Sequence, residues 1–197
     1  HPVIYAGQGI HYAKAWKELK ELAEQWNIPV TTSIEGKSAF PEDHPLSLGS
    51  GGRANSRPVK RYLEESDLIL GLGVSFALTA FGVPMPPGKK IIHATLDPMD
   101  LNKDVPADIG LIGDAKLTLA ALNSELSNAD NSKAAARANE PEKINELKEE
   151  WLQEWLPKLT NNEAPINPYR VVAELNQLVD KEKVGITHVA GCPRDQI

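Results

Sequence analysis

The sequence contains little cysteine, no long apolar run and no excess of basic residues. Cys192 is the single cysteine among 197 residues, so an internal disulfide is impossible and we expect a cytoplasmic location. No apolar run approaches the roughly 20 residues that span a bilayer, and we therefore expect no membrane partner. The formal net charge is -6 without a basic patch, which argues against binding to nucleic acid.

The sequence also lacks the patterns of several catalytic and metal sites. Its five histidines stand at no ligand spacing, and Cys192 has no cysteine partner, so we expect no metal site within this chain. Ser75 follows an apolar run as in a nucleophile elbow, but an elbow requires a helix next. The prolines of residues 81–87 exclude that helix, and Ser75 is therefore not expected to be a nucleophile.

What the sequence does contain is an alternation of apolar runs and amphipathic stretches. Apolar runs followed by turn residues predict six strands, at residues 3–6, 28–32, 46–48, 68–72, 90–96 and 109–112. Helical spacing of apolar residues predicts intervening helices at 15–26 and 58–65, and a last helix at 114–126. The sequence therefore predicts an α/β fold: a Rossmann-like six-stranded parallel sheet with helices on both faces and strand order 3-2-1-4-5-6.

The composition changes after this alternating region. Residues 127–141 are rich in Asn, Ala, Ser and charge without an apolar period, which predicts a linker that proteases cleave first. A charged helix follows, and its single apolar stripe needs a partner surface. The stripe consists of Ile144, Leu147, Trp151, Leu152, Trp155 and Leu156.

The two chain ends suggest a piece of a larger protein. The chain starts at His1, without methionine and next to an apolar run. A helix at 169–179 and a strand at 184–188 begin a new unit that is too small to be a domain. We therefore expect a central nucleotide-binding-like domain over 1–126, a linker with an amphipathic helix over 127–164, and the truncated start of a C-terminal domain over 165–197.

The loops after the predicted strands hold glycines, small polar residues and carboxylates. In an open parallel sheet, ligands bind outside the carboxyl ends of the strands. Glycine lets the backbone approach a ligand and point N–H groups at phosphate oxygens, and a carboxylate accepts hydrogen bonds from ribose or adenine. The sequence therefore predicts a nucleotide site at this edge, formed by Gly7, Gly9, Thr31, Gly49, Gly51, Gly73, Ser75, Asp97, Gly113 and Asp114.

The first loop resembles a dinucleotide fingerprint only in part. Tyr12 occupies the third glycine position of the pattern, and no acidic residue stands at the tip of the second strand, because Glu35 lies three residues beyond Thr32. An NAD-dependent oxidoreductase is therefore disfavoured. It remains one alternative function, and an independent nucleotide-sensing module is another.

Several segments of the first 126 residues occur in an order that is similar to one enzyme family. They include residues 2–9, 28–32, 36–42, 44–46, 67–73, 90–93 and 113–116. As a set they resemble the central domain of thiamine-diphosphate-dependent enzymes of the acetolactate synthase and benzoylformate decarboxylase kind. Residues 166–197 are similar to the opening of that family's C-terminal, diphosphate-binding domain.

The resemblance implies 2-oxo acid decarboxylation or carboligation, with thiamine diphosphate and Mg²⁺ as cofactors of the full-length enzyme. It implies that the activating glutamate and the metal motif belong to N- and C-terminal domains outside this chain, so we expect this chain alone to be inactive. Gly113-Asp114-Ala115 with Asn161-Asn162 imitates the metal motif, but Ala115 departs from it and the separation is too long. The resemblance also implies a homodimer or homotetramer when full length.

The family's central domain binds FAD in acetolactate synthases, ADP in some relatives and nothing in others. FAD-binding members tend to carry an arginine-rich segment after the fourth strand, where residues 75–79 read Ser-Phe-Ala-Leu-Thr here. This departure disfavours FAD binding, and we expect at most weak binding of an adenine nucleotide such as ADP. Val189 stands where relatives often have Asp, which is expected to perturb the adjoining cofactor domain.

Overall fold

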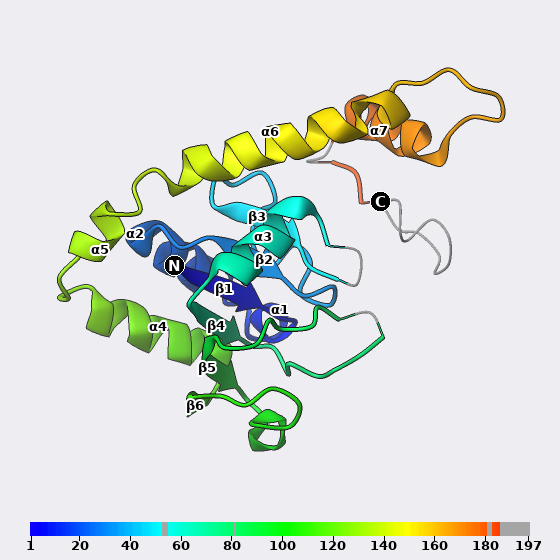
Figure 1. The fold of residues 1–197 in the computed structure, drawn as a ribbon. Coiled ribbons are helices and arrows are strands. Elements are labelled where there is room, and N and C mark those ends of the chain that lie inside the picture. The colour runs from blue at the N-terminus through cyan, green and yellow to red at the C-terminus, as the bar shows by residue number, and fades with distance from the viewer. Residues whose placement is uncertain (53–54, 81, 181–182, 186–197) are drawn as a thin grey trace. The chain divides into compact units, whose positions relative to one another are not determined.

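The computed structural model describes residues 1–52, 55–80, 82–180 and 183–185. They divide into two compact units, of which the first is His1–Lys148 and the second begins at Glu149 (Figure 1). Among the described residues, no helix is both long enough and apolar enough to cross a membrane. The predicted site residues all lie in the first unit.

The first unit is built on a parallel sheet of six strands (Figure 1). The order is β3-β2-β1-β4-β5-β6, with helices around the sheet, and this confirms the predicted fold class. Every neighbouring pair is parallel, so the carboxyl ends of all six strands meet at one edge. The strands are β1 (Pro2–Ala6), β2 (Val30–Thr32), β3 (Ser47–Ser50), β4 (Leu68–Leu72), β5 (Lys90–Thr95) and β6 (Ile109–Ile112).

Four helices of the first unit connect or follow these strands. They are α1 (Gly9–Ala13), α2 (Trp16–Trp26), α3 (Arg57–Glu65) and α4 (Ala115–Leu126), and a 3₁₀ turn, η1 (Pro98–Asp100), follows β5. The short α1 was not predicted: it ends at Lys14, which adopts a left-handed conformation with φ 52°. Helix α2 buries Leu19, Leu22 and Trp26 and ends at Asn27, as its apolar spacing predicted.

Residues 127–148 belong to the first unit, although composition suggested a linker over 127–141. The short helix α5 (Ser132–Ala135) buries Ala134, and the guanidinium of Arg137 donates two hydrogen bonds to the Trp26 carbonyl at 3.0 and 2.7 Å. Asn27 Nδ2 donates to the Ala134 carbonyl at 3.1 Å. The first contact satisfies the Trp26 carbonyl at the end of α2, and the second satisfies a carbonyl of α5. Such contacts leave no apolar period in the sequence.

The second unit contains the end of α6 (Glu140–Leu159) and α7 (Pro168–Leu178). The rings of Trp155 and Tyr169 meet edge to face with centroids 5.0 Å apart, which joins the two helices. The apolar stripe of α6 is divided: Ile144 and Leu147 are buried in the first unit, whereas Leu152 and Leu156 are exposed. Most of the strand expected at 184–188, as well as Val189 and Cys192, lies outside the described residues.

Candidate functional site

The loops that follow β1 and β4 interlock where the strand order reverses. The Gly9 amide donates to the Gly73 carbonyl at 2.8 Å, and Gly73 has φ +59°. A Cβ at Gly9 would lie 2.7 Å from the Cα of Gly73, and a Cβ at Gly7 would collide with the Gly73 carbonyl. Glycine is therefore required here because two backbone loops touch each other.

The amides predicted to cradle a phosphate already have partners within the chain. The Gly7 amide donates to the Leu72 carbonyl at 2.9 Å, and the Gly73 amide donates to the Ala94 carbonyl at 2.8 Å. The Gly51 amide likewise donates to the Thr32 carbonyl at 2.7 Å, and the Gly113 amide to the Thr95 carbonyl at 3.0 Å. An incoming phosphate would have to compete with these hydrogen bonds, so the glycine loops are a poor ready-made anion site.

A cavity of about 130 Å³ opens between these loops at the switch point. Two of the predicted site residues, Gly7 and Ser75, line this cavity. A third, Gly73, lies next to it and contacts Gly7. Its volume is below the roughly 300–1,000 Å³ of sites that enclose a drug-sized ligand. The other described lining residues with polar side chains are Tyr5, Gln8, Ser33, Glu35 and Thr79.

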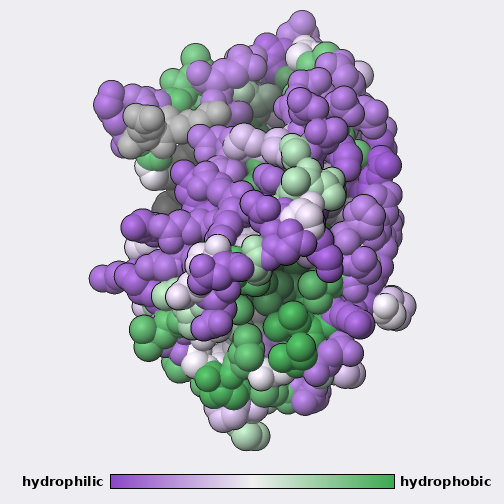
Figure 2. All heavy atoms as spheres, turned by 90° about the vertical axis from the view of Figure 1, so that its left-hand side faces the viewer, coloured by the Kyte–Doolittle hydropathy of each residue, from purple (hydrophilic) through white to green (hydrophobic). Residues whose placement is uncertain are grey.

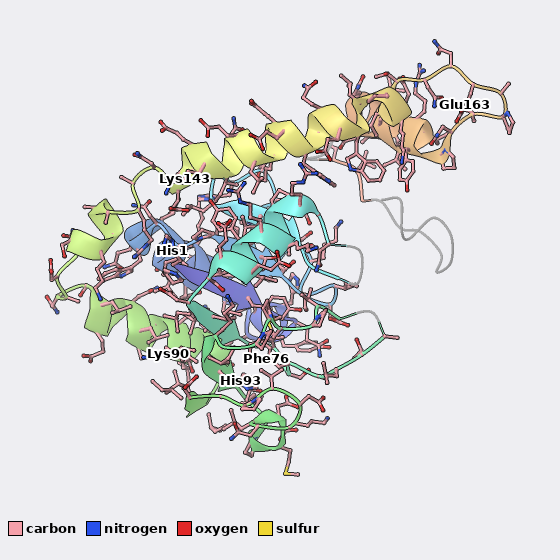
Figure 3. The ribbon with its side chains drawn as sticks, in the orientation of Figure 1. His1, Phe76, Lys90, His93, Lys143 and Glu163 are labelled. Atoms are coloured by element: carbon pink, nitrogen blue, oxygen red, sulfur yellow. The ribbon has the colours of Figure 1, made fainter. Side chains whose placement is uncertain are left out.

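One wall of the cavity is an aromatic stack across the sheet edge. The Phe76 ring stacks on Tyr5 with centroids 5.7 Å apart and meets His93 edge to face at 4.8 Å (Figure 3). Phe76 is buried although its φ is 52°, and Gly71 provides the space for its ring. His93 Nε2 lies 2.6 Å from the Val74 carbonyl, so that nitrogen carries the proton and donates. His93 therefore positions the loop that carries Phe76.

Among the described residues that line this cavity, the one charged group comes from the loop after β2. The Ser33 amide donates to the Ala6 carbonyl at 2.8 Å, and a Cβ at Gly36 would lie 2.6 Å from that same oxygen. The loop thus folds back over Gly7 and brings Glu35 to the cavity. Burial raises the pKa of the Tyr5 hydroxyl above its ordinary value, and the nearby Glu35 carboxylate adds to this effect.

The other predicted site residues have local structural partners and do not line this cavity. The Thr31 hydroxyl donates to the Gly49 carbonyl at 2.9 Å, and the Gly49 amide donates to Ser47 Oγ at 3.2 Å. Asp97 Oδ1 accepts the Met99 amide at 2.9 Å and so begins η1. Asp114 Oδ1 accepts the Lys116 and Leu117 amides and caps α4.

The described residues offer no metal centre, since no group of three or more His, Cys, Asp or Glu side chains lies close enough together. Six residues that line the cavity were not predicted from the sequence: Tyr5, Gln8, Ser33, Glu35, Phe76 and Thr79. Gly36 is the sequence feature from which the position of Glu35 could have been predicted. A glycine four residues after a strand allows the loop to fold back onto the sheet edge.

Comparison with known proteins decides the family. Residues 1–122, more than half of the chain, match the family described as "Thiamine pyrophosphate enzyme, central domain". The chain belongs to this family. The match covers the six strands and most of α4, and therefore the whole edge on which the cavity lies.

Similar proteins agree with this assignment of a central domain. A "Probable acetolactate synthase large subunit" of Methanococcus aeolicus is 34% identical over 187 residues, which is 91% of this chain and 31% of that protein. The corresponding protein of Methanocaldococcus jannaschii is 35% identical over 182 residues, which is 91% of this chain and 30% of that protein. The chain thus spans about a third of the length of these relatives.

A solved structure is also similar to this chain. It is a putative thiamin diphosphate-dependent enzyme from Mycobacterium smegmatis, with a TM-score of 0.52 and 29% identity. The likeness covers 63% of this chain and 24% of that protein. Sequence and fold therefore assign the chain to the same kind of domain.

Proposed function

We propose that this central domain is the scaffold of a thiamine-diphosphate-dependent enzyme of the acetolactate synthase kind, acting on 2-oxo acids. The observation that carries the proposal is the family match over residues 1–122, together with relatives about three times as long. The described residues that line the cavity supply one carboxylate and several hydroxyl groups, and none of these residues is basic. This lining suits a supporting domain better than a reaction centre.

The proposed cofactors are thiamine diphosphate and Mg²⁺ in the full-length enzyme. The described residues do not fit the metal, because they present no cluster of three potential ligands. We therefore assign the cofactor-binding residues to other domains of the enzyme, which we propose assembles as a homodimer or homotetramer in the cytoplasm. The thiazolium group supplies the chemistry of decarboxylation when it is bound.

Binding of an adenine nucleotide at the switch-point edge is the finer part of the proposal, and we expect it to be weak. The glycine amides already have hydrogen-bond partners, and Glu35 would lie near a diphosphate of like charge. The cavity is also too small to enclose a dinucleotide. ADP should bind no more tightly than about micromolar, and FAD should not copurify.

Titration calorimetry with ADP tests this finer part. Glu35→Gln removes a like charge from the cavity and should strengthen ADP binding about threefold to tenfold, the effect of roughly 1 kcal/mol near a protein surface. Asp97→Ala is the comparison variant. If it binds ADP with the same affinity as the unmodified chain, Asp97 is not part of the site. If no heat of binding is detected up to millimolar ADP, the edge has a purely structural role. Submicromolar binding would instead favour a nucleotide-sensing module.

The scaffold proposal itself has a separate test. The purified chain, supplied with thiamine diphosphate, Mg²⁺ and pyruvate or benzoylformate, should release no carbon dioxide above a control without protein. Turnover that persists after repurification would contradict the assignment of the catalytic groups to other domains. Reduction of NAD by the chain would favour the alternative oxidoreductase, which Tyr12 disfavours because its bulky side chain occupies a glycine position.

A further inference from the structure

Lys148 of α6 has no carboxylate partner among the described residues, although this chain is acidic. Hydrophilic side chains cover most of the surface shown in Figure 2, and acidic residues outnumber basic ones by 27 to 21. Lys17 and Lys60, for example, each lie near the glutamate four residues later, with Nζ to Oε1 distances of 3.5 and 3.9 Å. The missing partner of Lys148 has a cause in the sequence of its helix.

The spacing of residues along α6 explains why Lys148 has no partner on its own helix. Side chains three or four residues apart are neighbours on a helix surface. Lys143 has Glu140 at that spacing, and its Nζ lies 2.7 Å from Glu140 Oε1. At the same spacings from Lys148 stand four residues without charge: Ile144, Asn145, Trp151 and Leu152. The helix therefore offers this lysine no carboxylate.

The side chain of Lys148 is half-buried next to the buried part of the α6 stripe, Ile144 and Leu147. Burial lowers the pKa of the Lys148 ammonium. The Glu42 carboxylate acts in the opposite direction with the smaller effect, and it already pairs with Lys37 at 3.8 Å. A larger share of this amine is therefore neutral at pH 7 than of an exposed lysine, and the neutral amine is the nucleophilic form.

Lys148 lines a cavity of about 510 Å³ in the first unit, between α6 and the loop that precedes β3. This volume lies within the roughly 300–1,000 Å³ of small-molecule sites, so a small electrophile can reach the amine. His44 also lines the cavity, but its ring is engaged: Nδ1 accepts the Leu46 amide at 3.1 Å, and Nε2 donates to Glu24 Oε1 at 3.1 Å. The nucleophile that the cavity presents is therefore the Lys148 amine.

The charges of the cavity determine which electrophiles it admits. Three carboxylates are among its described lining residues: Asp43, Glu142 and Glu146. They repel anions such as acyl phosphates, whereas an uncharged molecule pays no such penalty. The remaining wall includes Pro45, Pro141 and Ile144, which suits a small molecule with an apolar end.

We propose that Lys148 is a modification site that forms an imine with small uncharged aldehydes. The neutral Nζ adds through its lone pair to the carbonyl carbon, the carbonyl oxygen leaves as water with both hydrogens of the amine, and a C=N double bond forms. The step needs no oxidant or reductant. A 2-oxo acid that loses carbon dioxide leaves an aldehyde, so an enzyme of the proposed kind generates this electrophile. Only that source of aldehyde rests on the proposed function; the reactivity of Lys148 does not.

Reductive labelling of the purified chain tests the proposal. Acetaldehyde is added with dimethylamine-borane, an uncharged reductant that converts each imine to a stable ethyl amine, and peptide mass spectrometry gives the rate at each lysine. Lys103, an exposed residue of the loop after η1, is the reference. Lys148 should be labelled at least about threefold faster than Lys103 at pH 7. Glyoxylate, an aldehyde of similar size that carries a carboxylate, should lower the ratio of the two rates by at least about threefold.

Two variants test whether the missing partner causes the reactivity. Asn145→Glu places a carboxylate three residues before Lys148, the spacing of Glu140 and Lys143, and should slow acetaldehyde labelling of Lys148 about threefold. Asn145→Gln, the uncharged control, should be labelled like the unmodified chain, and circular dichroism should show both variants folded.

Three results would overturn the proposal. Labelling of Lys148 no faster than that of Lys103 would show that the amine is not activated. Equal rate ratios with acetaldehyde and glyoxylate would contradict the preference for uncharged aldehydes, and an unchanged rate in Asn145→Glu would contradict the role of the missing partner. None of these measurements depends on carbon dioxide release, so failure here leaves the scaffold proposal standing.

Discussion

At the scale of single residues, glycine contacts determine the geometry of the switch point. Gly73 combines a left-handed backbone with close contact to the next loop: a Cβ there would lie 2.9 Å from the Gly9 Cα and 3.0 Å from the Ile10 amide nitrogen. Gly88 has a similar φ of +78° but open space around the position of a Cβ. Alanine substitutions at the two positions therefore distinguish the free-energy cost of the backbone conformation from that of the steric collision.

Gly73→Ala should lower the free energy of unfolding by about 2–4 kcal/mol, since the strained backbone and the overpacked contact each cost about 1–2 kcal/mol or more. Gly88→Ala should lower it by about 1–2 kcal/mol through the backbone alone. Urea denaturation followed by circular dichroism measures both. Equal losses in the two variants would show that the contact between the glycine loops adds nothing to stability.

Residues of the cavity show what sequence reasoning could and could not reach. Gly7 and Gly73 lie in the loops after β1 and β4, where glycine allows a close backbone approach, and their role in binding a nucleotide stays a prediction. Their amides were expected to be available for a phosphate, but they are bonded to neighbouring carbonyls. Glu35 was set aside because it lies beyond the strand tip, and only the folded-back loop brings it to the cavity.

At the scale of elements, the strands were the most predictable feature. A parallel strand covered on both faces requires an almost continuous apolar run, so β4 and β5 could be identified from sequence alone. The packing of residues 127–139 could not, because it depends on the side chains of Arg137 and Asn27, which donate to backbone carbonyls. Polar contacts between distant segments leave no periodic pattern.

The contact of Arg137 with the end of α2 leads to a prediction about this segment. Burial lowers the pKa of the Arg137 guanidinium, but the group stays charged and donates twice to the Trp26 carbonyl. Arg137→Met should therefore lower the free energy of unfolding by about 1.5–3 kcal/mol, the range for hydrogen bonds with a charged partner. It should also speed limited proteolysis within residues 127–148.

Lys133→Met is the control for this measurement, because Lys133 is an exposed residue of the neighbouring α5. Its cleavage rate and stability should match those of the unmodified chain. If both variants were cleaved as slowly as the unmodified chain, the hydrogen bonds of Arg137 to the Trp26 carbonyl would not be what holds the segment to α2.

At the scale of the whole molecule, the chain divides into a unit built on the six-stranded sheet and a second, smaller unit, whose described residues include the end of α6 and α7. The order of motifs predicted the family, and the match over residues 1–122 confirms it. The domain boundaries at 126 and 164 remain predictions. The compact sheet unit extends to Lys148, so a useful experimental boundary for the scaffold lies there.

The rate of carbon dioxide release from pyruvate, in an enzyme that uses this chain as its central region, tests the scaffold claim most directly. The matching 187 residues of the Methanococcus aeolicus relative can be replaced by this chain, with thiamine diphosphate and Mg²⁺ supplied. The scaffold account predicts turnover by the hybrid above that of this chain alone, which should show none. A folded hybrid of native assembly size that binds the cofactor but releases no carbon dioxide would contradict it, as would turnover by the isolated chain.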